Sequence, residues 1–163
     1  MTLEQTVTVT EIMRIETVLS MRASGAHNDD GLVILELSSN RTIEIDVDGA
    51  RRWFLNGRFH REDGPAAEYT DGDKFWYLNG QLHREDGPAE EWADGSKFWW
   101  LNGLRHRADG PASEHADGTK LWYLNSRLHR ADGPAVEYAD GSKRWYLNGK
   151  QRSEEQSKRA SLA

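Results

Sequence analysis

Apolar and polar positions repeat with a strict period of 23 residues from Trp53 onwards. Each unit begins with Trp, a second aromatic residue and Leu, and continues through Asn-Gly, His-Arg, Asp-Gly-Pro-Ala and a second Asp-Gly. Four complete units run from Trp53 to Arg144, and a truncated fifth runs from Trp145 to Arg152. Such a period is typical of solenoids and repeat arrays, in which each unit buries its apolar side against its neighbours. The repeated tryptophans are Trp53, Trp76, Trp99, Trp122 and Trp145.

Two dipeptides in the unit, Asn-Gly and the second Asp-Gly, predict tight hairpins. Asn79-Gly80 and Asp71-Gly72 are examples, and both pairs favour two-residue type I′ turns with positive φ at the central residues. Between them lie five or six residues of strand character. We therefore expect an all-β fold, an elongated antiparallel β-hairpin array or meander. The Asp-Gly-Pro segment should interrupt strand pairing, because proline supplies no ladder donor.

Alternation along each strand assigns its side chains to two faces. Trp76 and Leu78 share one face with Lys74, whereas Phe75 and Tyr77 share the other. Trp and Leu recur in every unit, so we expect their face to form the core. The small residues that should leave room where units stack are Ala66, Ala89, Ala112 and Ala135.

Residues 1–48 are expected to form a β-rich acidic cap that leads into the repeats at 49–152. Thr6–Met21 alternates in a way that favours a strand, although Glu11–Met21 also fits a helical face. Leu32–Leu37 and Arg41–Val47 read as two further strands, and Asp48-Gly49 falls 23 residues before the equivalent pair of the first unit. The polar tail, residues 153–163, is either a short helix capped at its first residue or irregular.

Composition and charge narrow the function classes. The chain has no cysteine, which excludes disulfides and thiolate metal sites and fits a cytoplasmic protein. Its net charge of −6 comes from the first 50 residues, and the repeats are neutral, whereas nucleic-acid binders usually carry a basic excess. The longest apolar run is Leu32–Leu35, far short of the roughly 20 residues that cross a bilayer. We expect neither a nucleic-acid partner nor a membrane.

A column of histidines is the most conspicuous candidate for chemistry. Neighbouring units should lie about 10 Å apart, from a strand spacing of about 4.8 Å, which is too far for shared zinc coordination. The sequence contains no nucleophile elbow, phosphate-binding loop or dinucleotide motif, and its many glycines are interpreted as turn glycines. We predict no enzyme activity, no metal and no cofactor, with His and Arg packed on aromatic rings and Asp capping the Gly-Pro turn. The column comprises His60, His83, His106 and His129.

An aromatic–lysine column is the better binding candidate. With a two-residue turn at Asp71-Gly72, Tyr69 lies opposite Lys74, and the later units repeat this pair. Such pairs either support the sheet by cation–π contact or form a stripe that binds a partner. Deviations from the repeat, at Leu104-Arg105, Ser126 and Arg144, are a second pointer to a binding surface. The predicted binding residues are Tyr69, Lys74, Trp92, Lys97, His115, Lys120, Tyr138 and Lys143.

The unit, with its Trp, Asn-Gly, His and second glycine hairpin, resembles the membrane occupation and recognition nexus (MORN) repeat. It is more similar to a variant of bacterial, phage and large-virus proteins, over residues 41–152. The spacing from Trp to Asn-Gly is longer than in the usual MORN repeat, and Arg follows His where the usual repeat has Gly. The resemblance implies an elongated β-hairpin array used for protein interaction.

These features lead to three alternative functions. The first is a non-enzymatic protein-binding array, in a phage or bacterial setting an inhibitor of a host defence protein. The second is a self-assembling scaffold, for example a homodimer formed through exposed edge strands or the array end. The third is a protein that binds a small ligand or nucleotide between its units.

Overall fold

The structure is a computed structural model that describes residues 32–37 and 40–160. The predicted strand or helix within Thr6–Met21 and the turn at His27–Gly31 lie outside these residues. The described chain is nearly all β, with antiparallel hairpins joined in one long sheet, as the sequence predicted. Among the described residues, no helix is long and apolar enough to cross a membrane.

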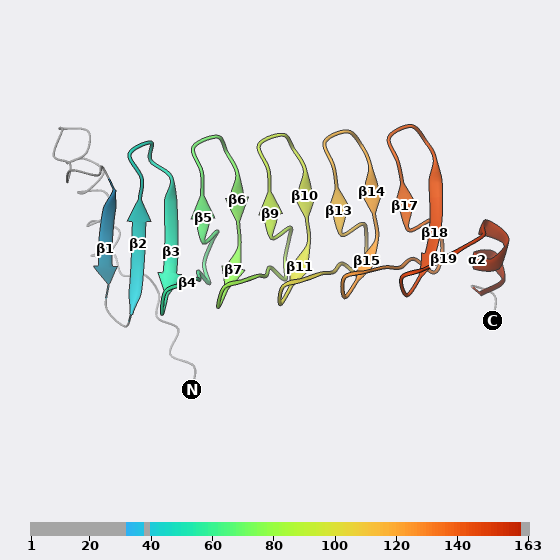
Figure 1. Cartoon of the computed structure of the whole chain (residues 1–163), viewed down its shortest axis with the longest axis horizontal. Coiled ribbons are helices and arrows are strands. Elements are labelled where there is room, and N and C mark those ends of the chain that lie inside the picture. The colour runs from blue at the N-terminus through green and yellow to red at the C-terminus, as the bar shows by residue number, and fades with distance from the viewer. Residues whose placement is uncertain (1–31, 38–39, 161–163) are drawn as a thin grey trace.

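The sheet has 13 strands that follow one another almost in chain order along a single axis (Figure 1). Two cap strands come first, so the expected strands at Leu32–Leu37 and Arg41–Val47 are confirmed. In spatial order, the strands are β1 (Val33–Leu37), β2 (Arg41–Ile45), β3 (Arg51–Leu55), β5 (Ala67–Glu68), β6 (Lys74–Phe75), β9 (Glu90–Glu91), β10 (Lys97–Phe98), β13 (Ser113–Glu114), β14 (Lys120–Leu121), β17 (Val136–Glu137), β18 (Lys143–Leu147) and β19 (Lys150–Arg152), with β4 (Arg58–Phe59) paired to β3.

Short hairpins continue the strands below the main sheet, at the bottom of Figure 1. They are β7 (Tyr77–Leu78) with β8 (Gln81–Leu82), β11 (Trp100–Leu101) with β12 (Leu104–Arg105), and β15 (Tyr123–Leu124) with β16 (Arg127–Leu128). Their turns confirm the predicted type I′ geometry: φ is 53° at Asn79 and 81° at Gly80. Ser126 adopts the same left-handed conformation, with φ of 59°, where the other units have glycine.

The hairpins at Asp-Gly differ from the prediction. Only Gly72 has a positive φ, of 106°, and the loop between Tyr69 and Asp73 has three residues instead of two. The Tyr69 carbonyl accepts from Gly72 N–H, and the Asp71 carboxylate accepts from Asp73 N–H over 3.1 Å. This is a type I turn closed by a left-handed glycine, stabilised by a local aspartate contact. The loop shifts the predicted register by one residue.

Because of the corrected register, Glu68 pairs with Lys74, and Ala67 pairs with Phe75. The predicted faces of Lys74–Leu78 remain valid, because the alternation within that segment is unchanged. The shift moves Tyr69 and Ala67, however, from the predicted face of Lys74 to the face of Phe75. The face that we call the clasp face carries Lys74, Trp76, Leu78, Glu91 and the equivalent residues of other units. The opposite face, called the aromatic face, carries Tyr69, Phe75, Tyr77, Glu90 and their equivalents.

Burial is divided between the two faces, so the expectation of a core on the Trp–Leu face is only partly correct. Every repeated tryptophan is half-buried, and Phe98 and Val136 are buried on the aromatic face. The alanines of the Gly-Pro-Ala segment are fully buried and lie where adjacent units meet, as predicted. The backbone of Ala89, for example, accepts from Trp76 N–H and donates to the Phe98 carbonyl, which ties it to the strands on both sides.

The C-terminal tail forms the helix α2 (Glu154–Ala160), which packs beside β18 at the end of the array. Ser153 Oγ accepts from Gln156 N–H over 3.2 Å, and Gln156 Oε1 accepts from Ser153 N–H over 2.9 Å. These reciprocal bonds are a capping box and confirm the helical alternative.

Candidate protein-binding faces

An arginine holds each complete unit together on the clasp face. The Arg84 guanidinium carbon lies 4.1 Å from the centroid of the Trp76 ring. Its Nε donates to Asp86 over 2.9 Å, and its Nη1 donates to the Pro88 carbonyl over 3.2 Å and to Glu91 over 3.0 Å. Cation–π contact, hydrogen bonds and ionic attraction thus act on one group. We call this arrangement the arginine clasp; Arg61, Arg107 and Arg130 repeat it.

The clasp explains the glycine that precedes each proline. A Cβ at Gly87 would lie 2.9 Å from the Arg84 guanidinium carbon, closer than real Cβ contacts come. No left-handed φ requires glycine at this position. The interpretation of every glycine as a turn residue is therefore wrong here, since this one makes room for the stacked arginine. The equivalent glycines, with Cβ distances of 2.8–3.0 Å, are Gly64, Gly110 and Gly133.

Each histidine joins one unit to the next. His83 Nδ1 accepts from Asn102 N–H over 3.1 Å and lies 2.9 Å from the Asn102 side-chain oxygen. Asn102 is the first residue of the next Asn-Gly turn, so the imidazole holds a residue with φ of 50° in place. The same contacts link His60 to Asn79, His106 to Asn125 and His129 to Asn148. The expectation that the histidines pack on aromatic rings is therefore wrong.

The truncated fifth unit departs from this pattern. Arg152 stands in the fifth histidine position, and the helix α2 follows it where the other units begin their Gly-Pro-Ala segment.

A third set of bonds joins the Asp-Gly tips of adjacent units. Asp73 accepts from Ala93 N–H over 2.7 Å, and Ser96 Oγ accepts from Ala116 N–H over 3.0 Å. Thr119 makes the equivalent bond, of 3.2 Å, to Ala139. The clasps, the histidine contacts and these tip bonds fix the side chains that are identical, or nearly so, in every unit.

The predicted aromatic–lysine pairs are not present. Lys74 lies between Glu68 and Glu91 in the register, and Lys97 lies between Glu91 and Glu114. Lys120 and Lys143 continue this alternation with Glu114 and Glu137. All four lysines are exposed on the clasp face, and the one-residue register shift accounts for the error.

The four predicted aromatic residues lie together on the opposite face. Tyr69 and Trp92 meet Phe75 edge-on, at ring distances of 5.8 and 5.4 Å, and His115 meets Phe98 at 5.2 Å. In the fourth unit, the Arg144 guanidinium lies 5.3 Å from the Tyr138 ring. Tyr69, Trp92 and His115 are exposed, which makes their row accessible to a partner.

Polar residues interrupt the aromatic face at its centre. The Arg105 guanidinium lies 4.7 Å from the rings of Phe98 and Trp100, in a position where the other complete units have Leu or Phe. Within the described part of the chain, Arg105 Nε and the fully buried Ser113 Oγ have no hydrogen-bond partner. Burial raises the pKa of the nearby Glu90 carboxyl, and attraction to Arg105 opposes that shift.

Each clasp lies in a loop that runs from its arginine to the following Asp-Gly, for example Arg84–Gly87, and grooves separate these clasp loops from one unit to the next. One of about 700 Å³ lies between the loops of the first two units, with Trp76 and Leu78 among its lining. Another, of about 360 Å³, is lined by Trp99 and Leu101. Their walls carry exposed carboxylates, including Asp86, whose pKa the Arg84 guanidinium holds below its ordinary value.

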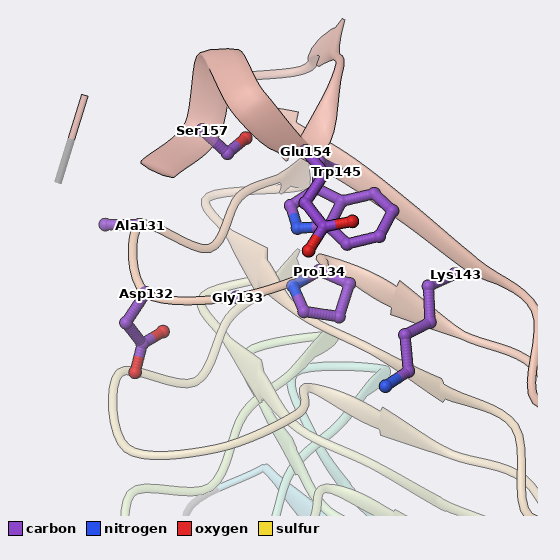
Figure 2. A pocket seen from close by; sticks show the side chains of 8 residues that line it. All are labelled: Ala131, Asp132, Gly133, Pro134, Lys143, Trp145, Glu154 and Ser157. Carbon is purple, nitrogen blue, oxygen red and sulfur yellow. The ribbon is translucent and has the colours of Figure 1, made fainter. Parts of the chain in front are cut away.

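A related groove of about 350 Å³ separates the fourth loop from α2 (Figure 2). Trp145 has no clasping arginine, because Ser153 stands in that position and begins the capping box of α2. Figure 2 shows Asp132 and Lys143 at opposite margins with the Trp145 indole between them. In the portion of the chain that the structure describes, no group of three or more His, Asp or Glu side chains could hold a metal ion.

The predicted site residues thus fall into two sets on opposite faces, four aromatic side chains on one and four lysines on the other. The predicted packing of the repeated arginines on aromatic rings is confirmed by their contacts with the tryptophans, but the sequence analysis missed the Asp, Pro carbonyl and Glu contacts that complete the clasp, although a signal for them was present. Arg, Asp and Gly recur at fixed spacing in every complete unit, and the glycine before proline has no hairpin to close. Comparison with models of known protein families gives no match for this chain, and comparison with curated proteins gives none either.

Proposed function

We propose that this protein is a non-enzymatic protein-binding array that recognises its partner through the aromatic face. One observation carries the proposal: every position on that face varies between units, whereas Trp, Leu, Arg, Glu and Lys on the clasp face are identical in all complete units. Five positions of the unit lie on this face, and each holds a different residue in at least one later unit. In the first unit they are Phe54, Phe59, Ala67, Tyr69 and Phe75. A repeated scaffold with a varied surface suits the recognition of one specific partner.

The chemistry of the face supports the same proposal. Aromatic residues and arginine are enriched where binding energy concentrates at protein interfaces. Trp92 is 42% exposed and Tyr69 is 39% exposed, although rings of this size are usually more buried. Arg105 and Arg144 add two guanidinium groups to the row.

The titratable groups of the clasp face favour a role in the scaffold over catalysis. Each repeated histidine contacts the next Asn-Gly turn, and each repeated arginine is bound by an aspartate and a tryptophan. A catalytic base or acid needs freedom to exchange a proton with a substrate. For this reason we propose a binding function without enzymatic activity.

Affinity capture from native host extract tests the proposal, with Trp92→Ala as the test variant and Lys97→Ala as the matched control. Both residues are exposed and lie five positions apart on opposite faces. We expect the wild type and K97A to retain the same saturable partner, and W92A to lose most of it. Mass spectrometry would then reveal whether the partner is a defence protein. Equal capture by the two variants would contradict a role for the aromatic face.

A further inference from the structure

The four Asn-Gly turns of the repeats have the same local sequence but differ in one backbone contact. In each turn Leu precedes the pair, and the asparagine has a positive φ. An Asn-Gly pair can react with itself, because glycine has no side chain to keep its nitrogen from the neighbouring side-chain amide. Since the local sequences are alike, only the surroundings in the fold can make one pair more reactive than another. The four asparagines are Asn56, Asn79, Asn102 and Asn148.

In the three later turns, the glycine nitrogen is bound to the preceding unit. Gly103 N–H, for example, donates to the Leu82 carbonyl over 2.9 Å, and the Gln81 side chain lies beside the glycine. An N–H that donates to a carbonyl must be released before it can lose its proton, which is also why such groups exchange hydrogen slowly. Equivalent bonds, each of 2.8 Å, hold Gly80 to Phe59 and Gly149 to Leu128.

The first turn, between β3 and β4, has no complete unit before it (Figure 1). Within residues 32–37 and 40–160, Gly57 N–H donates to no acceptor, and a Cβ at Gly57 would have no atom within 4 Å. Asn56 is held by Asn40 of the cap: its N–H donates to the Asn40 carbonyl over 2.9 Å, and its side-chain oxygen accepts from the Asn40 amide over 3.0 Å. The second bond stabilises negative charge on that oxygen, which favours attack at the adjacent carbon.

We propose that Asn56 is a site of spontaneous deamidation and that the fold protects the other three Asn-Gly pairs. Gly57 N–H gives its proton to water or hydroxide, and its nitrogen bonds to the side-chain carbonyl carbon of Asn56. The side-chain nitrogen leaves as ammonia, which takes up the equivalent of the lost proton, and a five-membered succinimide ring remains. Water then opens the ring at either carbonyl, which leaves aspartate or isoaspartate at position 56. Water is the only co-reactant that these steps consume.

Either product changes the junction between the cap and the first unit. Both carry a carboxylate where the turn had a neutral amide, beside Asn40. In isoaspartate the main chain also continues through the side-chain carboxyl, so the loop between Leu55 and Arg58 gains one backbone carbon. A two-residue type I′ turn does not accommodate this extra atom, so the pairing of β3 with β4 should weaken. The modification accumulates with the age of the molecule, and it does not depend on the proposed binding function.

Peptide mapping of the full chain tests the proposal, because trypsin leaves each of the four asparagines in a different peptide. The wild-type protein is incubated at mildly alkaline pH, folded in one sample and unfolded in urea in another. Mass spectrometry gives the rate at which each peptide changes from amide to acid, and an isoaspartate methyltransferase assay identifies isoaspartate. The peptides, each with a single asparagine, are Trp53–Arg58, Phe75–Arg84, Phe98–Arg105 and Trp145–Lys150.

In the folded protein, Asn56 should deamidate about tenfold faster than each of the other three, the factor that one hydrogen bond at the attacking nitrogen supplies. In urea the four rates should be alike. Ser126→Gly is the matched control, because it creates a fifth Asn-Gly pair in a turn whose N–H donates to the Arg105 carbonyl over 2.8 Å. The φ of 59° at Ser126 suits glycine, so the variant should fold, and Asn125 should react as slowly as Asn102.

Equal rates at the four asparagines of the folded protein would overturn the inference, as would a later pair that reacts faster than Asn56. An unchanged Asn56 peptide, after the time in which the urea sample has converted, would overturn it as well. Rapid deamidation of Asn125 in S126G would show that a bound nitrogen gives no protection, which contradicts the proposed cause. None of these results depends on partner capture, so this inference and the proposed function can fail separately.

Discussion

The two faces of the sheet are built from the same strands but follow different rules. On the clasp face, Arg84 contacts both Trp76 and Glu91, and the three residues recur unchanged in the other complete units. On the aromatic face, the equivalent positions hold apolar, acidic or basic residues without breaking the sheet. The comparison indicates that the invariant contacts of the clasp face determine most of the fold. The residues of the aromatic face are consequently free to vary from one unit to the next.

The largest expected difference between the faces is at two adjacent tryptophans. Trp99 supports the clasp of Arg107, whereas Trp100 lies on the aromatic face beside Arg105. Trp99→Ala should destabilise the protein by about 3 kcal/mol, since it removes a large ring and leaves the guanidinium without its stack. Trp100→Ala should cost about half as much. Urea denaturation followed by circular dichroism measures both, and equal losses would remove the distinction between the faces.

A second prediction concerns the glycine that faces the clasp. Gly110→Ala places a Cβ 2.8 Å from the Arg107 guanidinium carbon and should cost about 2 kcal/mol. The control is Gly95→Ala, where nothing lies within 4 Å and only the φ of 92° opposes a side chain, at about 1 kcal/mol.

The source of this cost can be isolated with a double-mutant cycle. Arg107→Ala removes the group with which the new Cβ collides, so R107A/G110A should be more stable than the sum of the single effects implies. Additive losses would show that Gly110 is required for a reason other than the stacked arginine.

Much of the fold could be predicted because its determinants are local. Asn79-Gly80 fixes a type I′ turn through two adjacent residues, and alternation assigns Trp76 and Tyr77 to opposite faces. The Asp71 turn was predicted with the wrong length, because a side-chain contact to Asp73 N–H favours three residues over two. Because of that single shift, the lysines lie beside glutamates of the neighbouring strands and not beside the aromatic residues that the sequence predicted.

The candidate site was harder to predict because its contacts are not local. The clasp of Arg84 requires the chain to fold back onto a ring eight residues earlier and onto Glu91 seven residues later. The histidines act 19 residues ahead, at the turn of the next unit. Four of the predicted binding residues do share one face, but it is the face of Phe75 and not the face of the lysines on which the predicted register placed Tyr69 and its equivalents.

A third prediction compares two histidines on different faces. His106 contacts Asn125 of the next unit, whereas the exposed ring of His115 lies against Phe98. His106→Ala should cost about 1 kcal/mol, the usual loss for a hydrogen bond that holds a backbone turn. His115→Ala should cost less than about 0.5 kcal/mol. Thermal unfolding of both variants provides the measurement, and a greater loss for H115A would contradict the role given to the histidine column.

The smallest expected effect is a change in pH dependence at the centre of the aromatic face. Burial raises the pKa of Glu90 in the folded protein, so the folded state holds its proton more tightly than the unfolded state does. This carboxyl therefore favours folding below its unfolded pKa, and that contribution is lost as pH rises through the raised folded value. At pH 7, Glu90→Gln should stabilise a monomeric sample by roughly a few tenths of a kcal/mol, because the group is only partly buried.

The gain should vanish below the unfolded pKa, where both side chains are neutral. Glu91→Gln is the matched control, since Glu91 lies on the clasp face and pairs with Arg84 over 3.0 Å. Its loss should destabilise the protein at pH 7, opposite in sign to E90Q. Stability curves for both variants between pH 4 and pH 7 test this pair of adjacent carboxylates. If both variants changed the free energy of unfolding with the same sign at pH 7, a carboxylate would have the same effect on stability on either face, which contradicts the prediction.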